Sequence, residues 1–206
     1  DISDDNLGNK GLFKNFVESR PPECKDLVFF IYSRINFVKP DIIKYLKELN
    51  VEEVFLGVES GDNRVFKQSF KGQTAGTVLR AVKLLKENNI KYFPSFILGL
   101  PGESEKSMSN TYNLCKQIAD IGGLDRLGCT ILQPIPGSPS YDNLLRDPEI
   151  GAELSRSDDI DLSYLERYWV EKFTDTNYDD VVGYREKINE LMKDYMVFGD
   201  TNNEKT

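Results

Sequence analysis

Residues 92–104, YFPSFILGLPGES, contain a strand, a tight turn and the start of a helix in uninterrupted succession. The run from Tyr92 to Leu98 is almost entirely apolar and rich in aromatic residues, which is typical of a strand covered on both faces. The two glycines that surround Leu100-Pro101 predict a turn. Glu103 and Ser104 are residue types that favour a helix N-terminus. The stretch is therefore one strand–loop–helix unit of an α/β fold.

The same unit recurs along the chain. Strands are also predicted at 28–32, 54–58 and 127–132, all mostly apolar. Between them lie amphipathic helices, whose apolar residues recur at spacings of three and four. Strict alternation of strand and helix indicates parallel strands with right-handed crossovers, in a barrel or an open doubly wound sheet. The helices are predicted to begin near Leu12, at Pro40, at Ala75 and before Met108.

Length and charge limit the function classes. The 206 residues can bury one full core, with room for a short appended segment. Lys and Arg number 26 against 34 Asp and Glu, a net charge of −8, which disfavours direct contact of this segment with nucleic acid or an anionic membrane. No apolar stretch is long enough to cross a bilayer, and the first residues lack the pattern of a signal peptide. We expect a cytoplasmic protein.

Cysteine and histidine usage excludes whole classes of site. The three cysteines, Cys24, Cys115 and Cys129, match neither a disulfide framework nor a metal-ligand spacing, so buried free thiols are favoured. The sequence contains no histidine. Ser-His-Asp and Cys-His hydrolases and histidine-ligated zinc or haem sites are therefore excluded. Any chemistry must use carboxylates, amines, backbone groups or a bound cofactor.

Candidate site residues follow the predicted strands. Ligands of parallel α/β folds bind at the carboxyl ends of the strands. Arg34 and Glu59 leave the first two strands there, although Arg34 could equally pair with a neighbouring carboxylate. Glu103 could simply favour the start of its helix. The proline-rich run 133–139, which begins at Gln133, predicts a rigid loop over the open end of the strands, with a structural linker as the other interpretation.

Beyond residue 139 the pattern changes to loops, including Asp147-Pro148 and an acidic stretch. Thr176 and Asn177 are then predicted to cap a last amphipathic helix that ends at Gly199. Residues 200–206 are polar, and we expect a disordered tail.

Taken in order, these features resemble the later strands of the radical S-adenosylmethionine (SAM) superfamily, especially the branch whose members often carry an upstream cobalamin-binding domain. The resemblance implies a partial (β/α)6 TIM-like barrel over 1–140, entered at the end of its second strand near Asp4-Asp5-Asn6, and a C-terminal loop and helical extension over 141–199. It rests on Gly57-Val58-Glu59-Ser60-Gly61, Lys71-Gly72, the helix Ala75–Asn89, the run Ile97–Glu103, and Pro136-Gly137-Ser138-Pro139.

The resemblance also implies contacts with the ribose and methionine portions of SAM. Arg34, Glu59 and Ser60 match the polar groups that leave the third and fourth barrel strands and meet these portions. Lys71 stands where several relatives hold the methionine carboxylate.

The adenine contacts are implied in the same way. Ile97, Gly99 and Glu103 match the fifth-strand motif that backs the adenine, although Ser95 replaces a glycine often found there. The loop at Gln133 would close the adenine side.

One departure from the family is large. The family holds a [4Fe–4S] cluster on a loop with three cysteines spaced C-x3-C-x2-C. Cys24, Cys115 and Cys129 cannot replace it, because they fall before a strand, on a helix and inside a strand. We expect the ligands to lie outside this chain, which would be part of a longer enzyme and inactive alone. A degenerate relative without a cluster is the other interpretation.

The leading functional hypothesis is therefore a radical SAM enzyme that reductively cleaves SAM to a 5′-deoxyadenosyl radical, which acts on an unknown substrate, with cobalamin as a further cofactor if an upstream domain holds it. A methylthiotransferase of the same superfamily, acting on RNA or a ribosomal protein, is one alternative. Another is an inactive barrel that serves as a nucleotide-binding or interaction module. An ordinary TIM-barrel lyase or aldolase is disfavoured, because the predicted strands lack a lysine for a Schiff base.

Overall fold

The structure, a computed structural model, describes residues 10–68, 72–156 and 161–199. Within them, parallel strands form one sheet in the order β1-β2-β3-β4, with each strand next to its neighbour in sequence. The predicted α/β class with parallel strands is thus confirmed. The strands are β1 (Phe29–Arg34), β2 (Val51–Glu59), β3 (Lys91–Leu98) and β4 (Gly128–Ile131).

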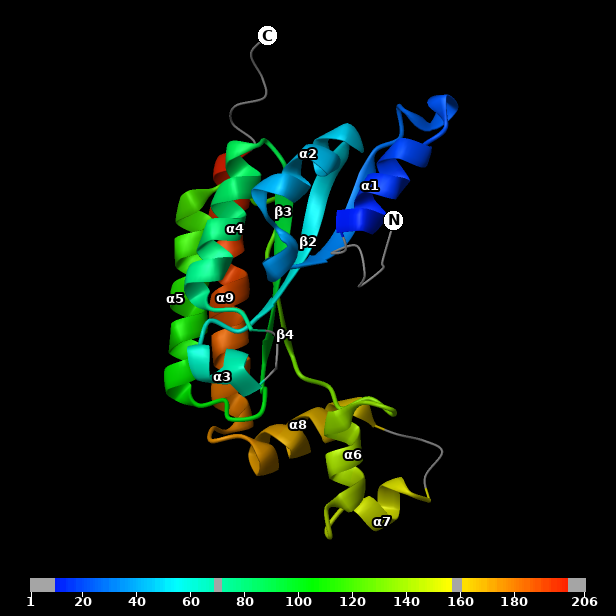
Figure 1. The fold of residues 1–206 in the computed structure, drawn as a ribbon. Helices are drawn as coiled ribbons and strands as arrows, with labels where there is room; N and C mark the ends of the chain where they lie inside the picture. Colours follow the sequence, from blue (N-terminus) through cyan, green and yellow to red (C-terminus); the bar gives the residue numbers. More distant parts are fainter. Residues whose placement is uncertain (1–9, 69–71, 157–160, 200–206) are drawn as a thin grey trace.

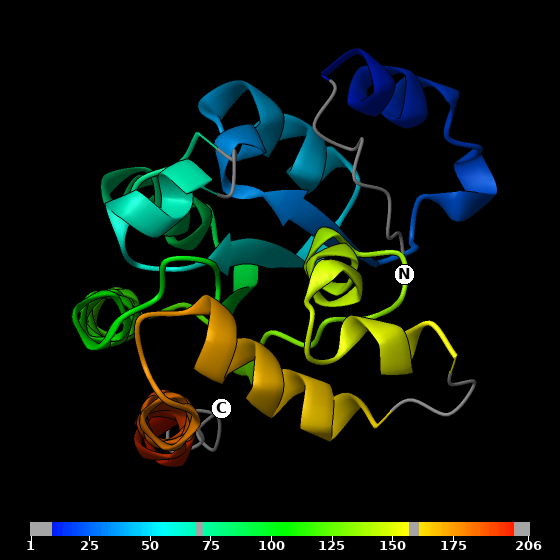
Figure 2. The ribbon, with the colours of Figure 1, turned by 90° about the horizontal axis from the view of Figure 1, so that it is seen from below.

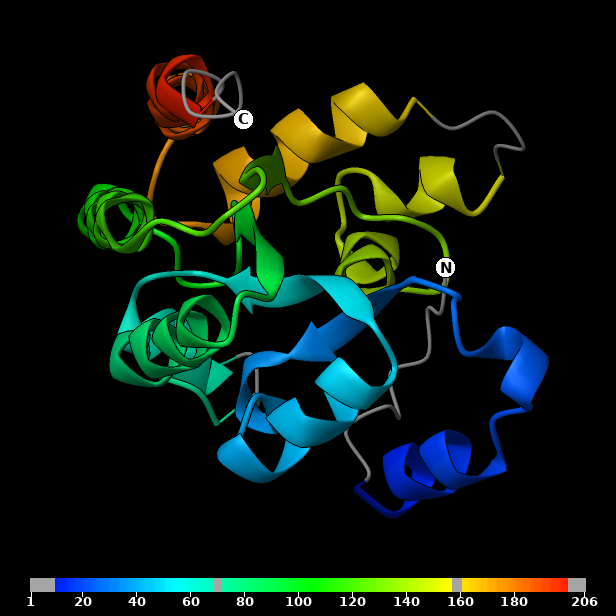
Figure 3. The same cartoon turned by 90° about the horizontal axis from the view of Figure 1, so that it is seen from above.

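Helices connect successive strands on one side of this sheet. Figures 2 and 3, which view the molecule from below and from above, show α2, α4, α5 and α9 in an arc around the sheet. The helices before and between the strands are α1 (Lys10–Ser19), α2 (Pro40–Glu48), α3 (Asn63–Gln68), α4 (Ala75–Glu87) and α5 (Glu105–Ile121), with short 3-10 turns η1 (Pro22–Cys24) and η2 (Ile35–Phe37).

Local sequence explains where the connecting helices begin and end. Pro40 occupies the first turn of α2, where its missing N–H costs nothing. Thr74 and Ser104 form capping boxes at the start of α4 and α5, each accepting a hydrogen bond from the backbone three residues on. Gly122, in a left-handed conformation with φ 71°, ends α5. These boundaries agree with the sequence prediction to within two residues.

The sheet has two different faces. The covered face packs against the helices through side chains such as Leu56, Phe96 and Leu98, which are fully buried. The open face carries the alternate residues of the same strands, among them Ile97. It also carries Tyr32, Phe55 and Phe93, whose rings touch one another across the strands at centroid separations of 4.7 and 4.8 Å. Because side chains alternate along a strand, neighbours in sequence belong to opposite faces.

The sequence prediction of loops after β4 is wrong, because this region is helical. Three short helices lie in the described part of this region, and only then does α9 begin. Ser138 caps the first of them with Pro139 in its first turn, so the proline-rich run leads directly into a helix. Asn177 accepts a hydrogen bond from the Asp180 amide at 2.9 Å, as expected of a cap. The elements are α6 (Pro139–Arg146), α7 (Gly151–Leu154), α8 (Leu162–Phe173) and α9 (Tyr178–Gly199).

These C-terminal helices occupy two places. Figure 1 shows α6, α7 and α8 gathered beyond the carboxyl ends of the strands, whereas α9 runs beside α5. α9 also contacts β4. Within the described residues, no helix combines the length and the apolar character that crossing a bilayer requires.

Candidate functional site

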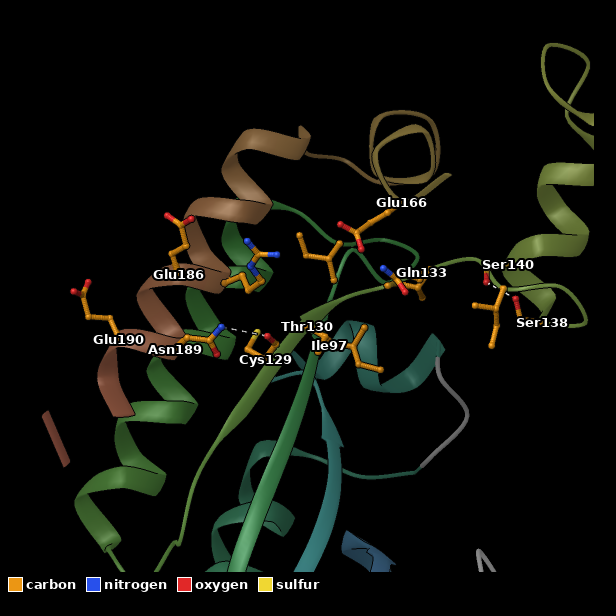
Figure 4. A pocket seen from close by; sticks show the side chains of 14 residues that line it. Ile97, Cys129, Thr130, Gln133, Ser138, Ser140, Glu166, Glu186, Asn189 and Glu190 are labelled. Atoms are coloured by element: carbon orange, nitrogen blue, oxygen red, sulfur yellow. Dashed lines mark hydrogen bonds between the residues drawn. The ribbon is translucent and has the colours of Figure 1, made fainter. Parts of the chain in front are cut away.

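A pocket of about 1130 Å³ lies where β3 and β4 end. Ile97 of β3 and Gln133, just beyond β4, both line it, so the structure brings together two residues selected from the sequence. Figure 4 shows Ile97 beside Thr130, its partner in the β3–β4 pairing, with Gln133 farther along the segment that follows β4. The lining is completed by Cys129, Ile131, Leu132, Ile135, Ser138, Ser140, Glu166, Arg185, Glu186, Asn189 and Glu190.

The side chains of this pocket divide by chemistry. The β3–β4 side offers the apolar surface of Ile97 together with the exposed amide of Gln133. On the helical side, Glu166 is buried and accepts a hydrogen bond from the Tyr178 hydroxyl at 2.7 Å. Glu186 points away from Ile97 and Gln133 (Figure 4). A flat, apolar ring with polar edges is the ligand type that suits the β3–β4 side.

Two further predicted residues end neighbouring strands at the same edge of the sheet. Arg34 is the last residue of β1 and is paired in register with Gly57 of β2. Glu59 is the last residue of β2 and has a left-handed backbone with φ 72°, next to a register shift. This conformation is unfavourable for a residue with a side chain and is often found at functional sites.

The loop after β3 requires glycine at its first position. Gly99 has φ 79°, and a Cβ built there would lie 3.2 Å from Cγ2 of Val170 on α8. The same Cβ would lie 3.6 Å from Cγ2 of Ile131. Gly99 thus lets the backbone turn between α8 and β4 two residues after Ile97, which lines the pocket.

Gly61, by contrast, serves helix packing. A Cβ built at Gly61 would lie 2.5 Å from the Cα of Thr111 on α5, and the Gly61 amide donates to the Thr111 hydroxyl at 2.9 Å. Ser60 is buried beside it, with its hydroxyl 3.4 Å from that of Thr111. The Ser60-Gly61 part of the motif therefore brings the β2 loop against α5, away from the pocket.

Glu103 is also turned toward α5. It is completely buried, and one carboxylate oxygen accepts a hydrogen bond from the Ser107 hydroxyl. The other oxygen, Oε2, has no hydrogen-bond partner among the described residues. Burial and, to a lesser extent, the nearby charge of Asp62 raise the pKa of Glu103 to about 7, against the opposing effect of Ser107 and the amides of Leu100 and Gly99. Glu103 lies under the β3–α5 loop and does not line the pocket.

Asp62 and Lys71 both lie in the connection between β2 and α4. Although burial acts to raise it, the pKa of Asp62 is held below its usual value by the Asn110 amide and by the backbone amides of Arg64 and Val65. Asn110 donates to Asp62 at 2.7 Å. Lys71 lies outside the described residues, so its contacts stay a prediction.

The cysteines do not form a cluster site. Cys24 lies in η1, Cys115 on α5 and Cys129 on β4. Burial raises the pKa of Cys115 and raises that of Cys129 to about 12, so both are neutral thiols, whereas metal ligation requires thiolates. Over residues 10–68, 72–156 and 161–199, no group of three or more Cys, Asp or Glu residues could hold a metal ion. The residues present therefore do not fit an iron–sulfur cluster.

Sequence reasoning missed several residues around the site. Gln73 is buried and donates through Nε2 to the carbonyl of Val58 at 2.7 Å, near the end of β2. Asn189 of α9 donates to the carbonyl of Cys129 on the edge strand at 3.4 Å. Arg185, on the same helix, lines the pocket. A polar residue recurring on one side of α9 is a weak signal, because exposed helix faces are polar everywhere.

Comparison with known proteins identifies the family. The model of the Radical SAM superfamily matches residues 11–115. A protein of Methanocaldococcus jannaschii, provisionally named a methylthiotransferase, is 32% identical over 116 residues, which make up 56% of this chain and 25% of that protein. The tRNA-2-methylthio-N(6)-dimethylallyladenosine synthase of Zymomonas mobilis is 34% identical over 103 residues, 49% of this chain and 22% of that enzyme.

A solved structure has the same fold. The radical S-adenosylmethionine methyltransferase TsrM from Kitasatospora setae, determined with cobalamin and a [4Fe–4S] cluster bound, superposes with a TM-score of 0.56. The match covers 66% of this chain and 27% of that chain at 16% sequence identity. The chain spans about a quarter of the length of the relatives it matches.

Proposed function

The chain belongs to the radical SAM superfamily, and on this premise we propose that it forms the SAM-binding part of the barrel of an enzyme that cleaves SAM reductively. One observation carries the proposal. Ile97 and Gln133, chosen from the sequence as adenine contacts, line one pocket at the carboxyl ends of β3 and β4. Bound SAM, reduced by one electron from the iron–sulfur cluster, would give methionine and a 5′-deoxyadenosyl radical able to take a hydrogen atom from the substrate; the protein supplies binding, orientation and exclusion of water.

Each residue has an assigned part in holding SAM. Ile97 packs against the adenine ring, and the Gln133 amide donates to or accepts from its polar edge. Arg34 and Glu59, at the ends of adjacent strands, face the ribose and methionine portions. Lys71 pairs with the methionine carboxylate.

Ser60 and Glu103 act behind the pocket. Their contacts with Thr111 and Ser107 of α5 support the assignment of both to holding the strand-exit loops in place. Direct contact with SAM is assigned to neither.

We place the cluster ligands in another part of the whole protein, because the cysteines described here are dispersed and two of them are protonated. Cobalamin, bound by the TsrM relative, would likewise be held by a separate domain. No substrate is proposed, because the β3–β4 side of the pocket is assigned to the adenine of SAM.

A methylthiotransferase is a second candidate, because several relatives carry that activity in their names. The acidic balance of this chain, with a net charge of −8, favours a protein substrate, or an RNA held by a separate basic domain. Mass spectrometry of tRNA and ribosomal proteins from a deletion strain tests this. Loss of one methylthio group from either supports the candidate, and unchanged modification of both rejects it.

The proposed function is tested by titrating SAM into the intact, anaerobically reconstituted protein in a calorimeter. The wild type should bind, and Ile97→Asp should weaken binding roughly tenfold or more, because a charge replaces the apolar surface under adenine. Lys71→Ala should weaken it by about 1.5–3 kcal/mol, the range for a hydrogen bond to a charged group.

The matched control is Lys83→Asp, which places the same carboxylate on the exposed side of α4, away from the pocket. It should leave SAM binding unchanged. A wild type that binds neither SAM nor iron would support the inactive-module interpretation and reject the enzyme.

A further inference from the structure

Trp169, the single tryptophan of the sequence, is joined to the loop after β3. It lies on α8, is 1% exposed, and donates through Nε1 to the carbonyl of Gly99 at 2.8 Å. Its ring is stacked on Phe173 at a centroid separation of 4.6 Å. Because the indole is buried and belongs to α8, the position of its N–H is set by α8 and not by the loop.

The next residue of α8 contacts the same glycine. Val170 is fully buried, and its Cγ2 lies 3.2 Å from the place where a Cβ of Gly99 would stand. Gly99 is therefore held by a hydrogen bond to its carbonyl and by an apolar contact at its Cα. Both come from consecutive residues of one helix.

A second attachment lies at the other end of the loop. The amide of Asp175, just after α8, donates to the carbonyl of Glu103 at 2.8 Å, and Ser104 and Asp175 form an isolated parallel bridge. Residues 99–104 are thus connected to the segment 162–175 at both ends, although the two segments are about seventy positions apart in sequence.

We propose that Trp169 is a positioning residue for cofactor binding, acting through the carbonyl of Gly99. The loop 99–104 begins two residues after Ile97, so the orientation of the Gly99 peptide sets how the end of β3 is presented to the pocket. The helix α8, which follows β4 in the chain, thus contributes to the SAM site by positioning the end of β3. The identity of the ligand, SAM, rests on the proposed function. The attachment of the loop 99–104 to Trp169 does not depend on it.

The test compares Trp169→Phe with Phe173→Leu in the intact protein. The first variant keeps an aromatic ring and loses the N–H; the second loses the stacked ring and keeps the N–H. Amide hydrogen exchange of residues 99–103 is measured without SAM, SAM affinity by calorimetry, and the melting temperature of each variant as a measure of global stability.

Trp169→Phe should speed exchange in 99–103 and raise the SAM dissociation constant about threefold to tenfold, the equivalent of one net hydrogen bond. Phe173→Leu should change neither quantity at a comparable melting temperature. Unchanged exchange in Trp169→Phe, or equal effects of both variants in proportion to lost stability, would overturn the inference.

Two further outcomes distinguish a failure of the proposed function from a failure of this inference. If the wild type binds no SAM, the proposed function fails while the exchange result still decides whether Trp169 holds the loop. If Trp169→Phe does not fold, Val170→Ala takes its place, since it removes only methyl groups next to Gly99 and must also speed exchange in 99–103.

Discussion

The covered and open faces of the sheet are built from the same strands but carry different side chains. On the covered face, Leu56, Phe96 and Leu98 are fully buried against helices. On the open face, Ile97 lines the pocket, and Tyr32 is partly exposed. One motif can therefore contribute to stability and to binding at once, because its successive residues face opposite ways.

The strand-exit motifs show the same division. From the run that begins at Ile97, the isoleucine side chain reaches the pocket while Glu103 is buried against α5. From the β2 exit, Ser60 and Gly61 pack on α5 directly after Glu59. Some residues of a motif that predicts a cofactor site therefore pack loops against helices behind the pocket and do not line it.

The largest expected effect concerns the three cysteines. After anaerobic reconstitution of this chain with iron and sulfide, we expect essentially no bound iron and no absorbance of an iron–sulfur cluster, because Cys115 and Cys129 are buried, neutral thiols. Iron counting is the measurement. About four irons per chain, lost on replacing any of Cys24, Cys115 or Cys129, would show that the cluster site lies within these residues.

The neighbours Phe96 and Ile97 test the division between faces directly. Phe96→Ala should lower the free energy of unfolding by about 3–5 kcal/mol, because it leaves a cavity in the core. Ile97→Ala should cost only about 1–2 kcal/mol, because its side chain is half-buried. Urea denaturation of both variants gives the two values. Equal losses would mean that the two faces do not differ as described.

The buried carboxylate of Glu103 predicts a pH dependence of stability. Its pKa is raised in the folded state to about 7 from 4.5, so its contribution is present below pH 4.5 and is lost as the pH rises through 7. Glu103→Gln should remove this dependence and stabilise the protein at pH 8 by up to about 3 kcal/mol. Denaturation at pH 5 and pH 8 measures it, with Glu87→Gln, on the exposed side of α4, as control. A variant less stable than the wild type at pH 8 would contradict the raised pKa.

Gln133 should give the smallest effect, and on binding alone. Its side chain is exposed, so Gln133→Ala should change the free energy of unfolding by less than about 0.5 kcal/mol. The SAM dissociation constant should rise about threefold to tenfold, the equivalent of one hydrogen bond. Calorimetry on the intact protein checks this, and an unaltered affinity would remove Gln133 from the site.

Much of the fold could be predicted from the sequence, because local signals determine it. The apolar runs predicted strands that the structure contains, and Thr74, Ser104 and Gly122 mark helix ends through their own hydrogen bonds and conformations. The short helices after β4 escaped prediction. One reason is that a helix of four residues, such as α7, offers too few turns for its periodicity to stand out.

The arrangement of the site was less predictable, because it depends on contacts between distant residues. Glu59 follows a register shift, and such a shift can change which way the next side chain points. The Trp169–Gly99 hydrogen bond joins residues seventy positions apart, so no local sequence pattern predicts it. The apolar run 92–98 predicted a strand covered on both faces, whereas Ile97, selected through the family resemblance, is half-buried on the open face. Glu103 depends on how the loop after β3 folds.

Hydrogen exchange of the intact protein with and without SAM tests most directly whether the open face is the cofactor face. If it is, SAM should slow exchange in the peptides that contain Ile97–Gly99 and Leu132–Gln133. No change is expected on the outer side of α4, between Arg80 and Glu87. Protection of that α4 segment, or SAM binding without protection at either strand exit, would contradict this assignment.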